Sequence, residues 1–333
     1  MKKKPQPPQP RKQKSGGKQK KQYKVRNWKE YNQSLVDRGK VIFHITEEAL
    51  EQWEETEKSG KRGRPKAYHD TAIETSISLQ QLFQLPLRQA EGLLSVMLLK
   101  LGSSVSAPDY STVSLRGKKL AISIRVRPIA QGPIHVVVDS TGAKVFGEGE
   151  WKVRQHGWSK HRRWKKLHLG IDEKTGDILV GDATGNDVAD GEMLEPLLAQ
   201  LPEGTTISQC SADGAYDHRS CYESLMKRGV PTITIAPRHD AKIWRHGNRK
   251  GDPHPRDKNL RRIREIGRAA WKAESGYHRR SLVETGMFRL KVSFGDRVSA
   301  RTDENQKVQL LLRCKLLNRF TMLGMPESYG VAA

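Results

Sequence analysis

The segment from Tyr277 to Lys291 carries side chains whose chemistry suits the binding of a divalent cation and of phosphates. It contains no proline and a single glycine, so a helix can run through it. At 100° per residue, an arc of about 60° holds four polar side chains: Tyr277, Arg280, Glu284 and Lys291. A carboxylate can hold the cation, and arginine and lysine can hold phosphates. The alternative is a surface helix with an intrahelical Arg–Glu pair.

The same helix is expected to anchor itself through an apolar stripe. Val283, Met287 and Leu290 follow one another at helical spacing beside the polar arc. This stripe would face a core and leave the four polar side chains at one edge of the buried face.

Two further acids stand where β-strands are expected to end. Asp139 follows the apolar run 134–138, which predicts a buried central strand, and Asp213 follows the more mixed run 206–212. Small residues come after both acids and would let backbone or nucleic acid approach closely. Asp139, Asp213 and Glu284 can therefore converge from two strands and a helix. Either aspartate alone could equally be a turn former.

These motifs resemble those of the DDE transposases. The spacing of the four polar residues, with two, three and six intervening positions, looks like the Tyr-Arg-Glu-Lys signature of bacterial insertion-sequence transposases. Residues 138–142 and 212–217 resemble the first and second acid motifs of these enzymes. Residues 26–32 and 62–68 look like one branch of them, the insertion-sequence-five family. The similarity covers roughly residues 24 to 322, with the motifs in the family's order.

The resemblance implies a two-metal mechanism that cuts DNA at the element's ends and joins each freed 3′-hydroxyl to target DNA. Asp139 would bridge two Mg²⁺ ions, for which Mn²⁺ is expected to substitute, and Asp213 and Glu284 would each complete one site. The remaining three signature residues would hold the scissile phosphate. Trp271, six residues before Tyr277, is a candidate for stacking on a displaced base.

The charge balance predicts a polyanionic partner. Sixty lysines and arginines against 37 acids give a formal net charge of +23 over 333 residues, which favours nucleic acid through counterion release. No run of 18 apolar residues points to a membrane, and no Walker-type loop points to a nucleotide cofactor. With the resemblance, we expect double-stranded DNA, at the element's ends and at the target, bound by a homodimer.

The cysteines and histidines add little chemistry of their own. Three cysteines at wide spacing predict reduced thiols in a cytoplasmic compartment. The resemblance implies a bacterial, nucleoid-associated protein. The histidines lack the spacing of a zinc site with two histidines and a carboxylate on one helix.

The chain before residue 131 is expected to consist of a basic tail and a helical DNA-binding region. Residues 1–26 form a low-complexity basic tail that cannot fold alone, and the tail is either solvated or lies along phosphates. Residues 27–130 are interpreted as a helical DNA-binding region. Its first clear helix is predicted over 47–58, with Thr46 as the N-cap.

Two basic stretches in this helical region are candidate DNA contacts. Arg62 and Arg64 lie in an Arg-Gly-Arg-Pro segment that is either a minor-groove arm or a basic linker. The run 68–120 predicts three helices, the last of which carries Arg116 and Lys119. Such a unit resembles a helix-turn-helix, with the last helix entering a major groove.

Residues 131–325 are interpreted as an RNase H-like catalytic domain, a mixed β-sheet flanked by helices. Strands and helices alternate in the order that this fold requires. The expected elements are strands 134–139, 166–172 and 177–183, helix 190–201, a strand ending at 213, a helix ending at 225, strand 232–236 and helix 308–320. A turn at 174–176 should join the second and third strands.

Two basic insertions interrupt this domain. The first, 150–166, combines tryptophans with the cations Lys160, Arg162 and Arg163, which suits phosphate contact and base stacking, although the tryptophans could instead fill a core. The second, 238–264, is expected to be a loop that either becomes ordered on DNA or stays solvated.

Two other functional classes remain open. An RNase H-fold nuclease of another kind would cleave without joining ends. A noncatalytic DNA-binding protein derived from a transposase would bind only, but binding alone does not require three carboxylates, which repel phosphates.

Overall fold

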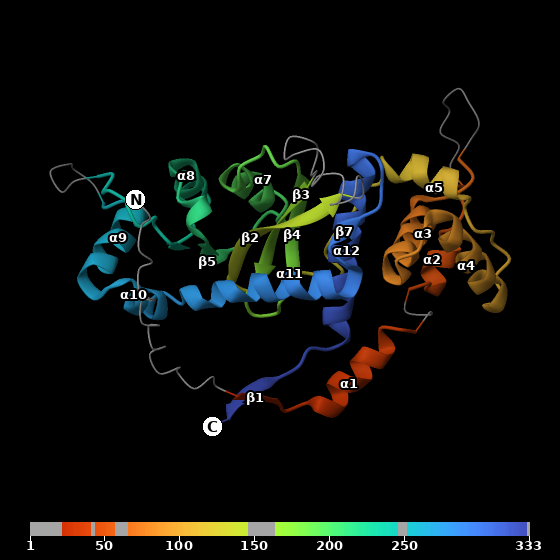
Figure 1. The fold of residues 1–333 in the computed structure, drawn as a ribbon, viewed down its shortest axis with the longest axis horizontal. Coiled ribbons are helices and arrows are strands. Elements are labelled where there is room, and N and C mark those ends of the chain that lie inside the picture. Colours follow the sequence, from red (N-terminus) through yellow and green to blue (C-terminus); the bar gives the residue numbers. More distant parts are fainter. Residues whose placement is uncertain (1–21, 41–43, 57–65, 146–163, 246–251, 332–333) are drawn as a thin grey trace, which may run out of the picture.

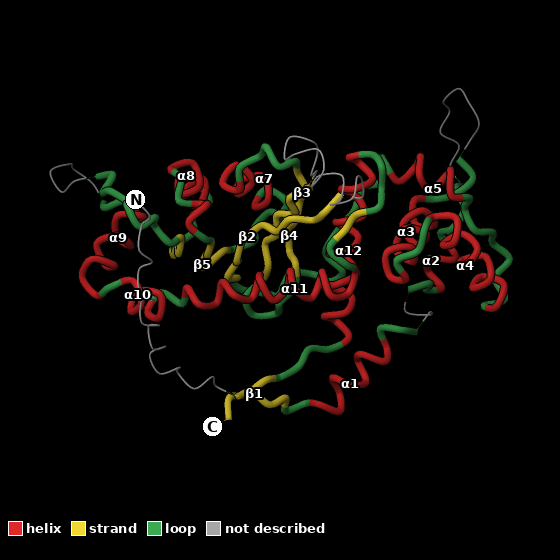
Figure 2. Tube along the Cα trace, viewed as in Figure 1, coloured by secondary structure: helices red, strands yellow, loops and turns green. Residues whose placement is uncertain are grey.

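A mixed β-sheet lies at the centre of the chain, with helices on both faces (Figures 1 and 2). The computed structural model describes residues 22–40, 44–56, 66–145, 164–245 and 252–331. Within these residues the sheet has the strand order β4-β3-β2-β5-β6, and β7 pairs with the far end of β2. The strands are β2 (Ile134–Val145), β3 (Trp164–Asp172), β4 (Ile178–Thr184), β5 (Ile207–Ala212), β6 (Thr232–Ile235) and β7 (Arg297–Val298).

The strand directions agree with the predicted RNase H-like core. Strands β2, β3 and β4 are antiparallel, whereas β5 and β6 run parallel to β2. The hairpin between β3 and β4 confirms the predicted turn, because Asp172 accepts hydrogen bonds from the backbone N–H groups of Lys174 and Thr175. Gly176 has a φ of 73°, a conformation that suits glycine.

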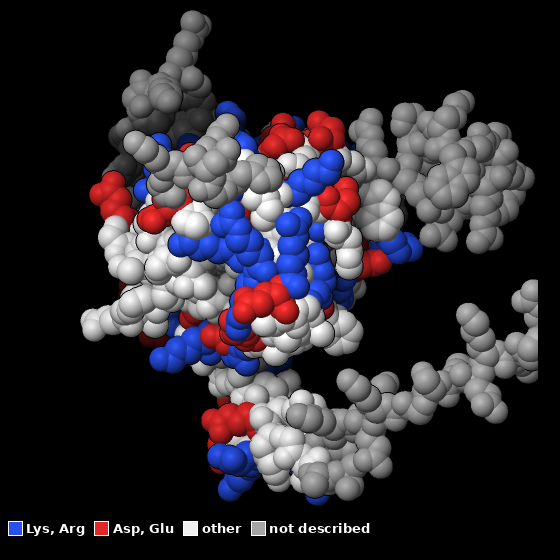
Figure 3. Space-filling model, turned by 90° about the vertical axis from the view of Figure 1, so that its left-hand side faces the viewer, with Lys and Arg blue, Asp and Glu red and all other residues white. Residues whose placement is uncertain are grey.

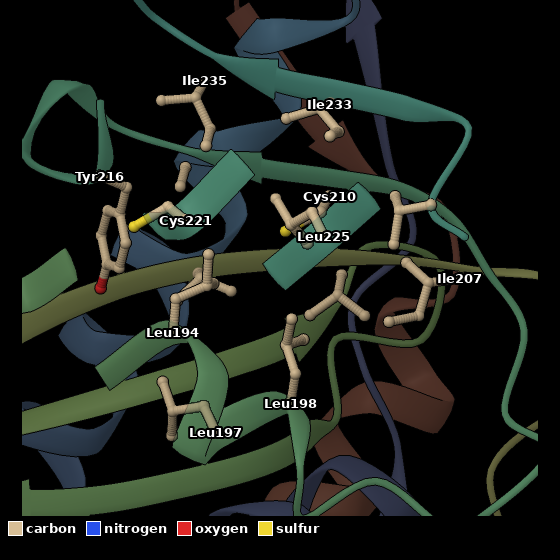
Figure 4. Close-up of a cluster of buried hydrophobic side chains, with 14 of the residues drawn as sticks. Leu194, Leu197, Leu198, Ile207, Cys210, Tyr216, Cys221, Leu225, Ile233 and Ile235 are labelled. Atoms are coloured by element: carbon tan, nitrogen blue, oxygen red, sulfur yellow. The ribbon is translucent and has the colours of Figure 1, made fainter. Parts of the chain in front are cut away.

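Each face of the sheet is covered by its own helices. On one face, α7 (Leu194–Leu198) and α8 (Arg219–Lys227) bury leucines against β2, β5 and β6 (Figure 4). On the other face lie α11 (Ser281–Phe294) and α12 (Asp303–Leu323). Asn318 of α12 donates to the Ile178 carbonyl and accepts from its N–H, both at 2.8 Å. The closing helix therefore packs on the sheet as predicted.

Several boundaries in this core differ from the predictions. β2 does not end at Asp139 but continues to Val145, because β3 pairs with it along its whole second half. The predicted helix 190–201 begins as a 3-10 turn, η2 (Asp190–Met193), and ends at Leu198. Beyond β5, a second 3-10 turn, η3 (Gly214–Tyr216), precedes α8.

The second insertion was wrongly predicted to be a loop throughout. It contains α9 (Pro255–Ile266), which is followed by α10 (Arg268–Glu274). His254 caps α9 by accepting from the Arg256 N–H, and Leu260 is buried beneath the helix. Proline at the first helical position also favours this start.

The N-terminal region contains the three predicted helices. They are α3 (Asp70–Phe83), α4 (Leu87–Lys100) and α5 (Tyr110–Gly117). They pack on the half of the chain that contains the sheet through α12, where Lys315 pairs with Glu74 and Arg313 donates to Gln81. The division of the chain at residue 130 remains a prediction.

Two shorter pieces precede these helices. α1 (Trp28–Asp37) follows β1 (Gln22–Val25), which pairs with β8 (Ser328–Val331) near the C-terminus. α2 (Glu47–Glu51) has the predicted cap Thr46 but is shorter than the predicted helix 47–58. It stops early because Trp53 is fully buried and its backbone carbonyl accepts from His69. In the described part of the chain, no helix is long and apolar enough to cross a bilayer.

Candidate active site

The parallel pairing of β2 with β5 brings two acids side by side. Val138 pairs with Ala212, so Asp139 and Asp213 follow aligned positions on neighbouring strands. β5 ends at Ala212, and Asp213 turns the chain into η3 by accepting a hydrogen bond from Ala215 N at 2.9 Å. The two carboxylates therefore stand where the parallel ladder ends, although β2 itself continues.

The third acid, Glu284, lies on α11, which covers one face of the sheet together with α12. The predicted single helix is two pieces, the 3-10 turn η4 (Tyr277–Arg280) and then α11. Val283, Met287 and Leu290 are buried, which confirms the apolar stripe. Glu284 lies in the first turn of α11, where a helix dipole favours negative charge.

Arg280 joins the helix to the strand. One guanidinium nitrogen, Nη1, donates to Asp139 Oδ2 at 2.6 Å, and Nη2 donates to Glu284. The intrahelical Arg–Glu pair, the simpler alternative from the sequence, does form. The same guanidinium also binds an acid 141 positions away in the chain, so the helix and the strand share one charged cluster.

The pKa of Asp139 depends on the charges of the other two acids, Asp213 and Glu284. The pKa of Asp139 is raised to about 6, chiefly by burial and additionally by the charges of Asp213 and Glu284. The Ser140 N–H, which donates to Asp139 Oδ1 at 2.8 Å, and the Arg280 charge act in the opposite direction. A cluster of this kind favours an added cation.

The donor chemistry of this cluster suits a hard divalent ion. All three acids offer oxygen only, which Mg²⁺ and Mn²⁺ prefer. Among the described residues, however, no three acid, histidine or cysteine side chains are gathered closely enough to hold a metal. Arg280 lies between Asp139 and Glu284 and supplies the positive charge in this arrangement.

The aromatic residues beside the site are part of a core. Trp271 is 2% exposed and packs against Tyr277, with ring centroids 5.7 Å apart. The proposed stacking of a base on Trp271 therefore has no open ring face in this structure. Tyr277 is also mostly buried and lies 5.8 Å from the Arg280 guanidinium, whereas Lys291 is partly exposed on α11.

The predicted DNA contacts outside the acid cluster have different outcomes. Arg116 is tied to its own fold, because it pairs with Asp70 and donates to the Tyr68 carbonyl. Lys119 is exposed just after α5. The remaining cations lie outside the described residues: Arg62, Arg64, Lys160, Arg162 and Arg163.

A buried ion pair close to the acids was not anticipated. Arg256 donates to both carboxylate oxygens of Asp217, at 2.6 and 3.1 Å, and both residues are buried. The guanidinium also lies 4.0 Å from the centre of the Trp244 ring. The only signal in the sequence was an acid four positions after Asp213.

This pair fastens the second insertion to the segment that follows β5. Figure 3 shows lysine and arginine side chains gathered on the face that Figure 1 has at its left, where α9 and α10 lie. Exposed cations of the insertion include Arg245, Lys258, Arg261 and Arg264. The insertion thus presents a basic surface on an ordered helix.

Comparison with protein families gives two matches, each to a model described as a transposase DDE domain. One match covers residues 36–148. The other covers residues 130–319, which is 190 of the 333 residues and includes all three acids of the cluster.

Proposed function

The chain belongs to the DDE transposase family, and from that premise we propose that it cuts DNA at the ends of an insertion sequence and joins the ends to target DNA. We place it in the insertion-sequence-five branch, acting on terminal inverted repeats. The observation that carries the proposal is the ion-pair cluster in which Arg280 joins Asp139 of β2 to Glu284 of α11. The family implies DNA as substrate and a divalent metal as cofactor.

We assign the metal to Asp139, Asp213 and Glu284, with two Mg²⁺ ions in the working enzyme and Mn²⁺ as a substitute. The support is the oxygen-only donor set and the raised pKa of Asp139, which is caused mainly by burial and also by the charges of Asp213 and Glu284. A bound divalent ion lowers the pKa of water or a 3′-hydroxyl and stabilises the leaving oxygen.

The cations of α11 and η4 have the task of holding DNA. In the described arrangement Arg280 neutralises two carboxylates, and it must release at least one of them for those oxygens to face a metal. Arg280 then becomes available to a phosphate oxygen, for which its planar fork is suited. Lys291 lies about two turns beyond Glu284 on α11 and can bind a neighbouring phosphate. Tyr277 holds Arg280 in place through ring contact.

The N-terminal helices and the homodimer complete the proposal at a coarser level. The helices α3 to α5 would contact the element's ends. A dimer would bring two ends together for joining. A noncatalytic DNA-binding protein is the second candidate, and the cluster argues against it because three carboxylates weaken phosphate binding unless a metal uses them.

The test is a cleavage and joining assay with Glu284→Gln. A duplex that carries the inverted repeats flanking the gene of this protein is incubated with the protein, a target plasmid and Mg²⁺. Cut and joined ends are scored on a gel. We expect wild type to produce both, and Glu284→Gln to lose both by at least about a hundredfold while still shifting the duplex. The matched control is Glu265→Gln, an exposed acid on α9 outside the cluster.

Near-normal cleavage by Glu284→Gln would refute the site assignment. Duplex binding by wild type without cleavage in Mg²⁺ or Mn²⁺ would favour the noncatalytic candidate. Cleavage without joining would point to a nuclease.

A further inference from the structure

A cavity of about 950 Å³ lies between the N-terminal helices and the half of the chain that contains the sheet. One wall comes from α3, α4 and α5, and the other from the end of α11, β7 and the start of α12. None of the three acids of the candidate active site lines it. The cavity is therefore a separate feature of the fold.

The lining has the chemistry of an anion site with an apolar side. No aspartate or glutamate is among the described residues that line the cavity, whereas four arginines are: Arg88, Arg297, Arg301 and Arg313. In the described part of the chain, neither Arg88 nor Arg301 pairs with an acid. Leucines, Phe294 and Tyr110 supply apolar surface, and the Arg88 guanidinium lies 4.4 Å from the Tyr110 ring centre.

Arg313 gives a second, independent indication that an anion belongs here. It is 4% exposed, and no carboxylate of the described residues lies within ion-pair distance of it. Its nitrogens donate only to neutral acceptors, the Gln81 amide and the carbonyls of Gly295 and Arg297. Burial lowers its pKa to about 10. A buried cation without a counter-ion is costly, and an anionic ligand in the cavity would offset that cost.

We propose that this cavity binds an unpaired segment of a DNA strand, with its phosphates among Arg88, Arg301 and Arg313 and a base against Tyr110. The proposal rests on the proposed function, because the strand it invokes is part of the DNA that a transposase would bind and cut. Arginine for phosphate and an aromatic ring for a base are the usual means of binding single strands.

The cavity lies along the helix that carries the third acid. Phe294 at the cavity wall is ten residues beyond Glu284 on α11, about 15 Å along the helix axis. At the spacing of stacked nucleotides this is roughly four to five positions. Lys291 lies between the two places and can hold a phosphate on the way. A strand that follows α11 from Glu284 would therefore reach the cavity four to five nucleotides from the bond that is cut.

The proposal is tested by binding without metal, which keeps it independent of cleavage. A fluorescein-labelled ten-nucleotide oligo(dT) is titrated in EDTA, and affinity is read by fluorescence anisotropy. We expect Arg301→Glu and Tyr110→Ala each to weaken binding at least about fivefold. The charge-matched control is Lys100→Glu, an exposed cation at the end of α4 outside the cavity. It should weaken binding less than about twofold.

A second readout places the strand directly. Bromodeoxyuridine in the same oligonucleotide is cross-linked by light, and the modified peptide is identified by mass spectrometry. A cross-link to Tyr110 or to the end of α11 supports the proposal. Equal losses in Arg301→Glu and Lys100→Glu, or cross-links elsewhere, overturn it. So does displacement by thymidine monophosphate at the concentration of the oligonucleotide, or equal binding of a hairpin duplex. All these results leave the cleavage test of Glu284→Gln unaffected.

Discussion

Asp139 lies where burial and two neighbouring carboxylates disfavour its negative charge, and a single arginine partly offsets this. Such a residue reduces the stability of the fold in return for a site that favours a cation. The cost can be measured because asparagine keeps the shape and the acceptor for the Ser140 N–H but carries no charge.

We predict that Asp139→Asn raises the free energy of unfolding at pH 7 in EDTA by about 1–3 kcal/mol. The folded pKa, about 6, lies above the ordinary value of 3.8, so the folded state binds the proton more tightly than the unfolded state. The charge of Asp139 therefore lowers stability fully above pH about 6, and this penalty disappears as pH falls toward 4. Urea unfolding of both proteins from pH 4 to pH 8 measures it.

The expected pattern is a stability difference that narrows as the pH is lowered. A difference independent of pH, or a variant less stable than wild type at pH 7, would contradict the prediction. Asp182→Asn is the control, because Asp182 is partly buried in the same sheet but lies outside the cluster and pairs with Lys307.

At the scale of the element, α9 depends on a contact far away in the chain. Most residues of α9 are polar or charged, yet Arg256 and Asp257 are buried. Asp257 accepts hydrogen bonds from the backbone N–H groups of Trp244 and Arg245. The helix is therefore held by buried charge pairs and backbone contacts together with a small apolar contribution from Leu260. This explains why periodicity alone did not reveal it.

We predict that Arg256→Met destabilises the protein by about 3–5 kcal/mol, because it leaves the Asp217 carboxylate buried without its partner. Urea unfolding measures the loss, and limited proteolysis locates it within the insertion. The matched control Lys258→Met changes an exposed cation two residues along the same helix and should stay within about 0.5 kcal/mol. Adding Asp217→Asn to Arg256→Met should restore part of the loss. Equal stability of the two methionine variants would show that the buried pair does not hold the insertion.

At the scale of the whole molecule, the charge of +23 is expected to govern affinity for DNA. The family acts on DNA, and the lysines and arginines on the face shown in Figure 3 can contact its phosphates. Each phosphate that a cation neutralises releases counterions, so the affinity falls as salt rises.

We predict that affinity for duplex DNA falls by about 10³-fold or more between 50 and 200 mM salt, corresponding to about six or more phosphate contacts. Fluorescence anisotropy with one duplex across the salt series gives the slope of log Kd against log salt. Thermal melting over the same series is the control that the fold is unchanged. A slope near zero would mean that apolar contacts, and not the charge, supply the binding energy.

The sequence by itself determined the features that depend on near neighbours along the chain. The apolar run before Asp139, the turn at 174–176 and the stripe Val283, Met287 and Leu290 are local patterns, so side-chain periodicity and turn chemistry were enough. The mixed sheet was also predictable, because the succession of strands and helices along the chain matches that of an RNase H-like fold. The roles of the three acids and of the signature cations remain predictions.

Tertiary structure alone decided which partners the polar and aromatic residues take. The local sequence allows Arg280 its neighbour Glu284 but does not show that Asp139 shares it, and nothing near Arg116 or Trp271 reveals that both are used inside the fold. At the surface, a charged side chain that pairs with a distant partner differs in free energy by only about 1 kcal/mol from one that stays in water. When the side chain is buried, the difference is several kcal/mol. The choice therefore depends on which groups the folded chain brings together and how deeply it buries them.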